Sequence, residues 1–170
     1  MNLDQIAILI ERLATSKNSH VLMVSRVCLS TGARWGEAEG LRVSQIQNGL
    51  IQFVKTKSSK ARSVPITADF EKALLNHFEE HGTGERLFAT AYSSFREAIK
   101  ATNLKLSDGQ LTHILRHSFA SHFMMNGGNI LALQKLLGHY SLTMTMRYAH
   151  LSPDHLEEAR RLNPIALLGR

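Results

Sequence analysis

The chain has 170 residues, enough for one domain with a sizeable core, and its composition is that of a folded globular protein, with 44% hydrophobic and 20% charged residues. Its single cysteine, Cys28, lies in an apolar run and excludes an internal disulfide framework. No apolar stretch reaches membrane-spanning length, and the start lacks the features of a signal peptide. We therefore expect a cytoplasmic protein with no membrane partner.

The net charge is +6 and the sequence pI is about 9.8. A basic balance favours an anionic partner, most often nucleic acid. Charge alone fits a basic protein without such a partner equally well.

The first part of the chain is predicted to be helical. A helix over residues 3–14 follows from apolar side chains at helical spacing, namely Leu3, Ile6, Ile10 and Leu13. A second helix is expected over 19–30, ending near Gly32, because glycine readily adopts the left-handed conformation that closes helices. The segment RWGEAEGL predicts a short helix that ends near Gly40.

The pattern then changes to strands. Asn48-Gly49 stands between the extendable segments SQIQ and LIQFV, which is a strong hairpin signal. A third strand, RSVPI, follows the polar turn KTKSSKA. Residues 43–66 are therefore predicted to form a small antiparallel sheet.

The helical period returns for the rest of the chain. Further helices are predicted at 68–81 and at about 92–103, 112–126, 130–137, 141–149 and 153–162. Asn129, Ser141 and Ser152-Pro153 have the residue types of helix N-caps. The fold class is α+β, mostly helical, in one domain over residues 1–170.

One predicted helix, THILRHSFASHFMM, keeps a narrow polar strip on an otherwise apolar surface. The strip holds His113, Arg116 and His117, and burying such side chains without partners is costly. This arrangement is typical of a helix that faces a polar pocket. When this helix is taken alone, a structural histidine with a surface arginine is the favoured interpretation.

His113 and His117 also have the four-residue spacing of two zinc ligands. However, the motif HILRH lacks the glutamate of the zinc hydrolase helix, and an arginine stands between the histidines. A fixed cation beside a divalent metal is unfavourable. We expect no metal here.

The segment KTKSSKARS supplies Lys55, Lys57, Lys60 and Arg62 with no acidic residue among them. It fits a solvated β-turn, and it equally fits a basic finger along a phosphate backbone.

Taken in order, these motifs resemble a known family. TGARWGE, the basic hairpin ending in SVPI, LTHILRHSFASHF, LLGH and a tyrosine nine residues past that last histidine occur in this order over roughly residues 20–155. The chain is similar to the catalytic domain of tyrosine recombinases, specifically temperate-phage integrases. The resemblance implies six catalytic positions: Arg34, Lys57, His113, Arg116, His139 and Tyr148.

The resemblance also implies a role for each position. Arg34 and Arg116 would clamp the non-bridging oxygens of a phosphodiester, with His139 as a further donor. Tyr148 would attack the phosphorus and form a 3′-phosphotyrosyl link. His113 would help to move the tyrosine proton, and Lys57 would protonate the departing 5′ oxygen. This chemistry needs no cofactor.

The same resemblance implies supporting roles for other residues. Glu37 would hold the arginine or the hairpin in place, and Lys55, Lys60 and Arg62 would contact DNA. Tyr140 is expected to pack or to face DNA.

The expected partners are double-stranded DNA at attachment sites, a tetramer of this chain on two duplexes, and accessory DNA-bending proteins of host or phage. The tail SPDHLEEARRLNPIALL would dock on its own core or on a neighbouring subunit, which would favour a dimer. A separate N-terminal DNA-binding domain is expected to be missing from this chain.

Three alternatives stay open at this point. They are a DNA-binding module of this fold without activity, a metal-dependent hydrolase that uses the histidines, and a Xer-type resolvase or topoisomerase of the same chemistry.

Overall fold

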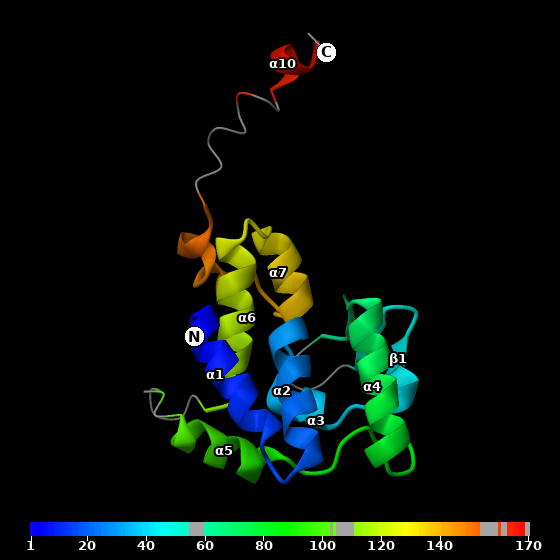
Figure 1. The fold of residues 1–170 in the computed structure, drawn as a ribbon. Coiled ribbons are helices and arrows are strands. Elements are labelled where there is room, and N and C mark those ends of the chain that lie inside the picture. Colours follow the sequence, from blue (N-terminus) through cyan, green and yellow to red (C-terminus); the bar gives the residue numbers. More distant parts are fainter. Residues whose placement is uncertain (55–59, 103, 105–110, 154–159, 161–162, 169–170) are drawn as a thin grey trace.

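Helix α2 (Ser19–Thr31) lies at the centre of the computed structural model and contacts α1, α3, α4, α5 and α6 (Figure 1). The structure describes residues 1–54, 60–102, 104, 111–153, 160 and 163–168. Nearly half of the α2 side chains are buried, and they are Val21, Val24, Ser25, Val27, Cys28 and Thr31. The fold is therefore organised around one buried helix.

The other helices follow in chain order. Their bounds are α1 (Leu3–Ala14), α3 (Trp35–Glu39), α4 (Ala68–His81), α5 (Tyr92–Ala101), α6 (His113–Met125), α7 (Ile130–Leu137), α8 (Thr143–Met146) and α10 (Pro164–Leu168). Two short 3₁₀ segments are η1 (Val43–Gln45) and η2 (Ala149–Leu151).

Several helices begin and end where the sequence predicts. Asn129 caps α7 by accepting hydrogen bonds from the backbone amides of Leu131 and Ala132. Gly32 ends α2 with φ 67°, and Gly138 ends α7 with φ 66°, both in the left-handed region that favours glycine. A Cβ on Gly32 would also lie 2.5 Å from the Phe119 ring, so packing excludes a larger residue there.

The sheet is three-stranded and antiparallel in the order β1-β2-β3, as predicted. Its strands are β1 (Ile46–Gln47), β2 (Leu50–Phe53) and β3 (Arg62–Pro65). Asn48 and Gly49 have φ values of 54° and 72°, so both central residues of the hairpin turn are left-handed. Ile51 pairs with Val64, and both side chains lie in the core.

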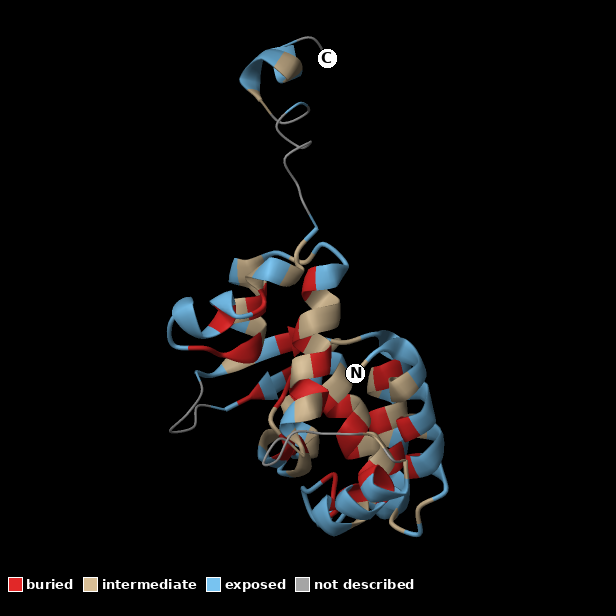
Figure 2. Cartoon of the chain, turned by 90° about the vertical axis from the view of Figure 1, so that its left-hand side faces the viewer, coloured by how far each residue is buried: buried red, intermediate tan, exposed pale blue. Residues whose placement is uncertain are grey.

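Buried residues form two separate clusters, which appear red in Figure 2. The larger cluster extends from α1 and α2 through the sheet to α5 and the start of α6, and it includes Cys28. Burial raises the pKa of the Cys28 thiol, so this residue belongs to the core as expected. The smaller cluster joins α6 and α7 to one tyrosine, and its buried members are Ala120, Met124, Leu133, Leu137 and Tyr148.

The structure corrects the predictions for the first strand and for the helix over 141–149. Ser44 and Gln45 lie in η1 rather than in a strand, so β1 is shorter than expected. The helix expected over 141–149 divides into α8 and η2, and Leu142 rather than Ser141 precedes α8. The helix predicted over 153–162 falls mostly outside the described residues.

Helix α10 stands apart from the helical body in Figure 1 and contributes no buried residue. Ile165 is 77% exposed and Leu168 is 82% exposed. None of the helices that the structure describes is both long and apolar enough to span a bilayer.

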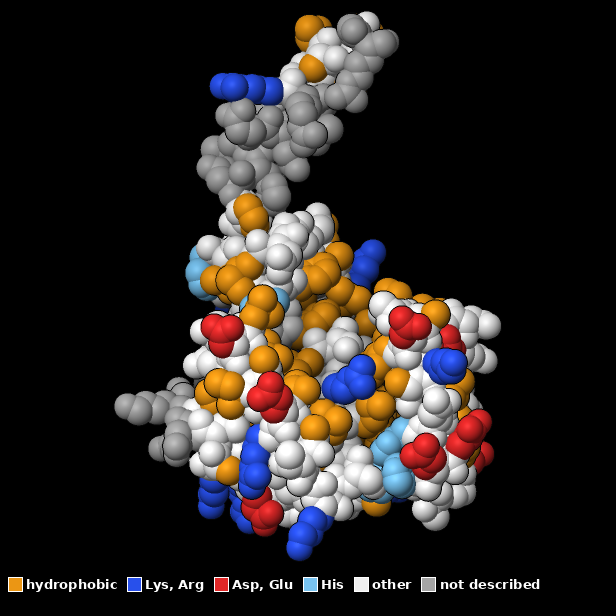
Figure 3. Space-filling view, viewed as in Figure 1, with side chains coloured by type: hydrophobic (Ala, Val, Ile, Leu, Met, Phe, Trp, Pro, Cys, Tyr) orange, Lys and Arg blue, Asp and Glu red, His pale blue; other side chains and the backbone are white. Residues whose placement is uncertain are grey.

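The face shown in Figure 3 intersperses acidic and basic side chains. A phosphate backbone needs a continuous run of cations. The face in view does not provide one.

Three histidines meet where α2 contacts α4. His20 Nδ1 and His77 Nε2 are 3.0 Å apart, and the His81 ring centre lies 4.9 Å from that of His77. Burial, and then the neighbouring His20 and His81, lower the pKa of His77 to about 4. The folded chain therefore holds His77 neutral at pH values where the unfolded chain protonates it.

We predict that this cluster makes the chain acid-sensitive. Below pH 6.5, the ordinary pKa of histidine, the unfolded chain binds more protons than the folded chain, so the free energy of unfolding falls as pH falls from 6.5 toward 4. His77→Gln removes one titrating ring and should make this dependence shallower in urea unfolding at a series of pH values, while His139 keeps its own contribution. His150→Gln, at an exposed position, is the control and should keep the wild-type slope. An identical slope for the His77 variant and the wild type would refute the assignment.

Candidate active site

Side chains from distant parts of the chain line one pocket of about 280 Å³. They come from the start of α3, from α6, and from the segment between α7 and η2. The lining residues are Arg34, His113, Arg116, His117, His139, Thr143, Met144, Arg147 and Tyr148. Five of the six predicted catalytic residues are among them, and the sixth, Lys57, lies outside the described residues.

Arg116 is buried at the base of this pocket and joins two helix ends. Its Nη1 donates to the carbonyl of Gly32 at 2.7 Å, and its Nη2 donates to the carbonyl of Leu137 at 2.8 Å. Gly32 and Leu137 lie at the C-terminal ends of α2 and α7, where carbonyls lack helical partners and carry partial negative charge. The guanidinium therefore fixes these two helix ends with respect to α6.

The positive charge of Arg116 persists despite its burial. Burial, and then the nearby charges of Arg34 and Arg62, lower the pKa of Arg116 to about 10, while Glu37 and Tyr148 act in the opposite direction. A guanidinium with this pKa stays protonated at neutral pH. The pocket thus has a permanent cation at its base.

The end of α7 binds a second arginine as well. Its last carbonyls each accept one hydrogen bond, namely Leu136 from Arg62 Nε at 2.7 Å, Leu137 from Arg116 Nη2 at 2.8 Å and Gly138 from the Lys60 amide at 3.3 Å. Strand β3 and helix α6 therefore both attach to the residues that immediately precede His139.

Glu37 connects Arg34, which lines the pocket, to Arg62 of strand β3, which lies outside it. Its carboxylate accepts a bidentate pair of hydrogen bonds from Arg62 at 3.0 and 2.8 Å, and it lies 3.6 Å from Arg34 Nη1. It also accepts the backbone N–H of Arg34 at 2.8 Å. The carboxylate thus orients Arg34 and anchors β3, which is the geometry that its predicted supporting role requires.

Arg62 anchors strand β3 in the DNA-free fold. Its side chain is only 5% exposed, and its guanidinium is engaged by Glu37 and Leu136 and stacks on Phe53 at 4.5 Å. The expected contact between Arg62 and DNA stays a prediction. Composition placed Arg62 with the lysines of the hairpin, but its strand position turns it inward.

Of the hairpin lysines, the structure describes Lys60 alone. Lys60 is exposed, and its Nζ lies 5.6 Å from the centre of the Tyr140 ring. Lys55 and Lys57 are outside the described residues, so their predicted roles stay predictions.

Tyr148 is buried, with 6% of its surface exposed, and its hydroxyl is hydrogen-bonded to His117 Nδ1. Burial raises the pKa of Tyr148, and the charges of Arg116 and Arg147 oppose that rise. Tyr140 is 46% exposed and does not line the pocket. Of the two tyrosines in this segment, Tyr148 is the one that lines the pocket with Arg34, Arg116 and Arg147.

The two histidines of the α6 strip differ in position. His113 is exposed and lines the pocket, and its ring centre lies 6.4 Å from that of His117. Burial and then the charges of Arg147, His113 and Arg116 lower the pKa of His117. His117 is therefore a neutral hydrogen-bond partner for the tyrosine near pH 7.

His139 is almost fully buried beside the arginines. Burial, followed by the charges of Arg116 and Arg34, lowers the pKa of His139 to about 4. Its Nδ1 lies 2.8 Å from the Thr145 hydroxyl. His139 is therefore neutral at pH 7 and has a defined hydrogen-bond partner.

The sequence analysis assigned no catalytic role to His117 and Arg147, which line this pocket, or to Thr145, which contacts His139. His117 was placed on the polar strip of its helix and weighed as a zinc ligand, and its position four residues after His113 already put it on the same face. Thr145 and Arg147 stand within one turn of Tyr148, and that proximity was the available signal. Which of them reach the pocket depends on the division of α8 and η2, which the hydrophobic pattern does not show.

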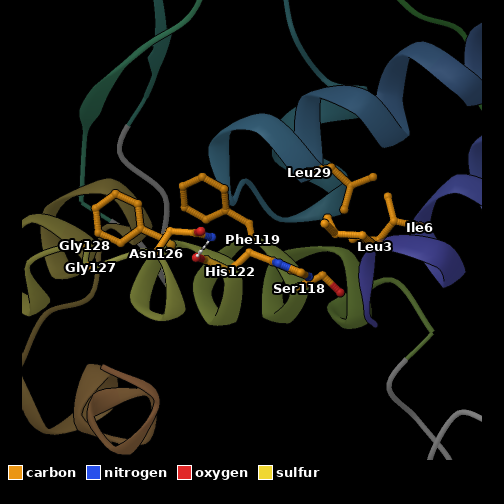
Figure 4. Close-up of a pocket in the computed structure, with 10 residues that line it drawn as sticks. Leu3, Ile6, Leu29, Ser118, Phe119, His122, Asn126, Gly127 and Gly128 are labelled. Carbon is orange, nitrogen blue, oxygen red and sulfur yellow. Dashed lines mark hydrogen bonds between the residues drawn. The ribbon is translucent and has the colours of Figure 1, made fainter. Parts of the chain in front are cut away.

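A separate apolar groove of about 480 Å³ lies between α1, α2 and α6 (Figure 4). Leu3, Leu29 and Phe119 line it, and it shares no residue with the cationic pocket. Within the described part of the chain, no group of three histidine, cysteine or acidic side chains is arranged to hold a metal ion.

Comparison with known proteins agrees with this geometry. The phage integrase family matches residues 1–155. The chain belongs to the phage integrase family. The integrase of Escherichia phage 186 is 50% identical over 162 residues, which are 95% of this chain and 47% of that protein. Tyrosine recombinase XerA of Saccharolobus solfataricus is 32% identical over 136 residues, which are 79% of this chain and 47% of that protein.

Among solved structures, the catalytic domain of bacteriophage HP1 integrase superimposes with a TM-score of 0.90 and 46% identity, covering 98% of this chain and 95% of that one. The mostly helical fold with its small sheet is thus the fold of an integrase catalytic domain. This family member spans about half the length of the curated relatives that it matches.

We predict that two arginine–carboxylate pairs of nearly equal length differ greatly in their contribution to stability. The Arg62–Glu37 pair is 2.8 Å long with side chains 5% and 8% exposed, whereas the Arg42–Glu85 pair is 2.7 Å long with side chains 59% and 66% exposed. Arg62→Ala leaves a buried carboxylate with less compensation and should lower the free energy of unfolding by about 3 kcal/mol or more. Arg42→Ala should lower it by less than about 1 kcal/mol. Urea unfolding of both variants checks this, and equal losses would contradict the structural role of Arg62.

Proposed function

We propose that this chain is the catalytic domain of a site-specific DNA recombinase that integrates and excises a phage genome. It cleaves one DNA strand through a covalent 3′-phosphotyrosyl intermediate and then rejoins the strand to a new partner. The observation that carries the proposal is the convergence of Arg34, Arg116, His139 and Tyr148 on one cationic pocket.

The pocket suits a phosphodiester because its fixed groups are hydrogen-bond donors. Attack on phosphorus builds negative charge on the non-bridging oxygens, and two guanidiniums stabilise that charge. Arg34 is oriented by Glu37, and Arg116 is held by two helix ends, so both cations are in place before the substrate arrives. Such preorganisation contributes more to the rate than flexible surface charges do.

Tyr148 is the nucleophile in this proposal. Because burial raises its pKa, a neighbouring base must take the phenolic proton during attack. We assign that transfer to His113, which lines the same pocket. His117 holds the hydroxyl in the DNA-free chain. Attack on phosphorus forms the tyrosyl ester and breaks the bond to the 5′ oxygen, which leaves with a proton.

Lys57 supplies that proton. The segment that contains it follows β2 and returns at Lys60, whose amide donates to the carbonyl of Gly138. Gly138 immediately precedes His139, so the hairpin re-enters the described structure next to the pocket. Lys55 and the exposed Lys60 contact the DNA backbone, and Lys60 lines a groove of about 770 Å³ that also includes His139.

Phage integration is favoured over resolution by a Xer-type enzyme because identity to the phage 186 integrase, at 50%, exceeds identity to XerA, at 32%. The complete set of reactive side chains favours an enzyme over a DNA-binding module without activity. The substrate is double-stranded DNA at attachment sites, and accessory DNA-bending proteins of host or phage assist its folding.

Four strand cuts are needed for one recombination event, so the working assembly is a tetramer on two duplexes. Helix α10 presents Ile165, Leu167 and Leu168 to solvent. In the assembly this helix packs on a neighbouring subunit, where its apolar side chains become buried. Full recombination also requires the sequence-specific contacts of a separate DNA-binding domain.

We predict that Tyr148→Phe abolishes covalent adduct formation because the attacking oxygen is lost. Binding to duplex DNA should remain nearly unchanged, since the lost hydroxyl is buried against His117. Tyr140→Phe is the matched control and should still form adduct. Gel separation of protein–DNA adducts on a nicked attachment-site duplex, followed by peptide mapping, identifies the attached residue. Adduct on the Tyr148 variant would refute the assignment.

We predict that Arg34→Ala slows cleavage by about a hundredfold or more at saturating DNA, because one transition-state donor is lost. Single-turnover rates on the nicked duplex measure this effect. Arg12→Ala, an exposed change on α1 away from the pocket, should keep the wild-type rate. An unchanged rate for the Arg34 variant would reduce this residue to a role in binding.

A further inference from the structure

His139 and Thr145 form a hydrogen-bonded pair inside the protein. The distance from His139 Nδ1 to Thr145 Oγ1 is 2.8 Å. Thr145 is 0% exposed and His139 is 9% exposed, so water does not compete for this bond. The second ring nitrogen of His139, Nε2, lies on the far side of the imidazole from Thr145.

The location of the single ring proton decides what His139 can do. Burial and the charges of Arg116, Arg34, Arg147 and Arg62 favour the neutral imidazole, which has one N–H and one bare nitrogen. If the proton is on Nε2, that atom donates to an anion in the pocket. If the proton is on Nδ1, the bare Nε2 faces the anion and repels it.

The hydrogen-bond inventory of Thr145 distinguishes these two arrangements. A hydroxyl has one proton to donate, and in the described part of the chain the only partner of Oγ1 is His139 Nδ1. If Nδ1 carried the ring proton and donated it to Oγ1, the buried threonine proton would have no acceptor. Leaving a buried donor unsatisfied costs about 1–3 kcal/mol. The arrangement in which Thr145 donates to a bare Nδ1 avoids this cost.

We propose that Thr145 is a positioning residue that fixes His139 as the Nε2–H tautomer, so that a neutral histidine donates a hydrogen bond to the scissile phosphate. The part that concerns phosphate rests on the proposed function. The tautomer itself is a property of the DNA-free chain and is measurable without any reaction.

The same residue links the histidine to the nucleophile. The backbone amide of Tyr148 donates to the carbonyl of Thr145 at 3.0 Å. One turn therefore fixes the tyrosine through its main chain and the histidine through its side chain. Changing the hydroxyl alone separates the two roles, because the main-chain bond does not depend on the side chain.

The tautomer is tested by NMR of the whole chain labelled with ¹⁵N-histidine. Long-range ¹H–¹⁵N correlation distinguishes a protonated ring nitrogen from a bare one, and His139→Gln assigns the signals. We expect a bare Nδ1 and a protonated Nε2 in the wild type at pH 7. Thr145→Ser retains the hydroxyl and should keep this pattern. Thr145→Val has nearly the same shape without the hydroxyl and should shift the proton toward Nδ1.

Cleavage rates supply the second measurement, on a nicked duplex with which the wild-type chain forms adduct. Thr145→Val should slow single-turnover cleavage by about tenfold to a hundredfold, as expected when a donor to the transition state is weakened. Thr145→Ser should restore most of the rate. Urea unfolding of both variants shows whether each is folded, and the serine variant keeps the test decisive if the valine variant is not.

Each outcome has a defined meaning. A protonated Nδ1 in the wild type, or an unchanged pattern in a folded Thr145→Val variant, overturns the proposal. A shifted tautomer with a wild-type cleavage rate overturns its catalytic part. Absence of adduct from the wild-type chain on any attachment-site duplex would refute the proposed function instead, and the NMR result would still decide the tautomer.

Discussion

The guanidinium of Arg116 lies between the C-terminal ends of two helices, and the arrangement of the pocket depends on it. A helix end exposes carbonyl oxygens that need donors, and α2 and α7 both stop at a left-handed glycine that turns the chain away. Arg116 satisfies one carbonyl at each end. The residues that follow these ends are Ala33-Arg34 and Gly138-His139, so the clamp sets the positions of two further pocket residues. A residue expected to bind substrate therefore also determines the local fold.

Charge in the pocket is arranged around one buried carboxylate. Without Glu37, Arg34 and Arg62 would place like charges near Arg116 with no compensation, and such a cluster is costly in a protein interior. Glu37 pairs with Arg62 and lies beside Arg34, which leaves the pocket cationic but stable. Burial first, and then neighbouring arginines, lower the pKa of His117 and His139 and keep both imidazoles neutral. Positive charge is thus concentrated on side chains that cannot lose it, and the imidazoles remain available for hydrogen bonding.

Much of this arrangement could be predicted from the sequence. Helix periodicity, Asn48-Gly49 and the caps at Gly32 and Asn129 are local signals, and they gave most of the described elements and the fold class correctly. The order of the motifs gave the family, and five of the six proposed catalytic residues line one pocket. The inward position of Arg62 was not predictable from composition, because it depends on strand register and on a carboxylate 25 residues away. The partner of the Tyr148 hydroxyl likewise depends on how a short helix breaks, which is decided by tertiary packing rather than by propensity.

Tyr148, the proposed nucleophile, belongs to the smaller of the two buried clusters, which has five buried members in the described part of the chain. Local opening of a protein costs free energy in proportion to the packing that it disrupts. Detaching the segment around Tyr148 would disturb this smaller cluster and leave the larger cluster around α2 intact. The hydroxyl of the proposed nucleophile thus lies in a region that can rearrange while the larger core keeps its packing.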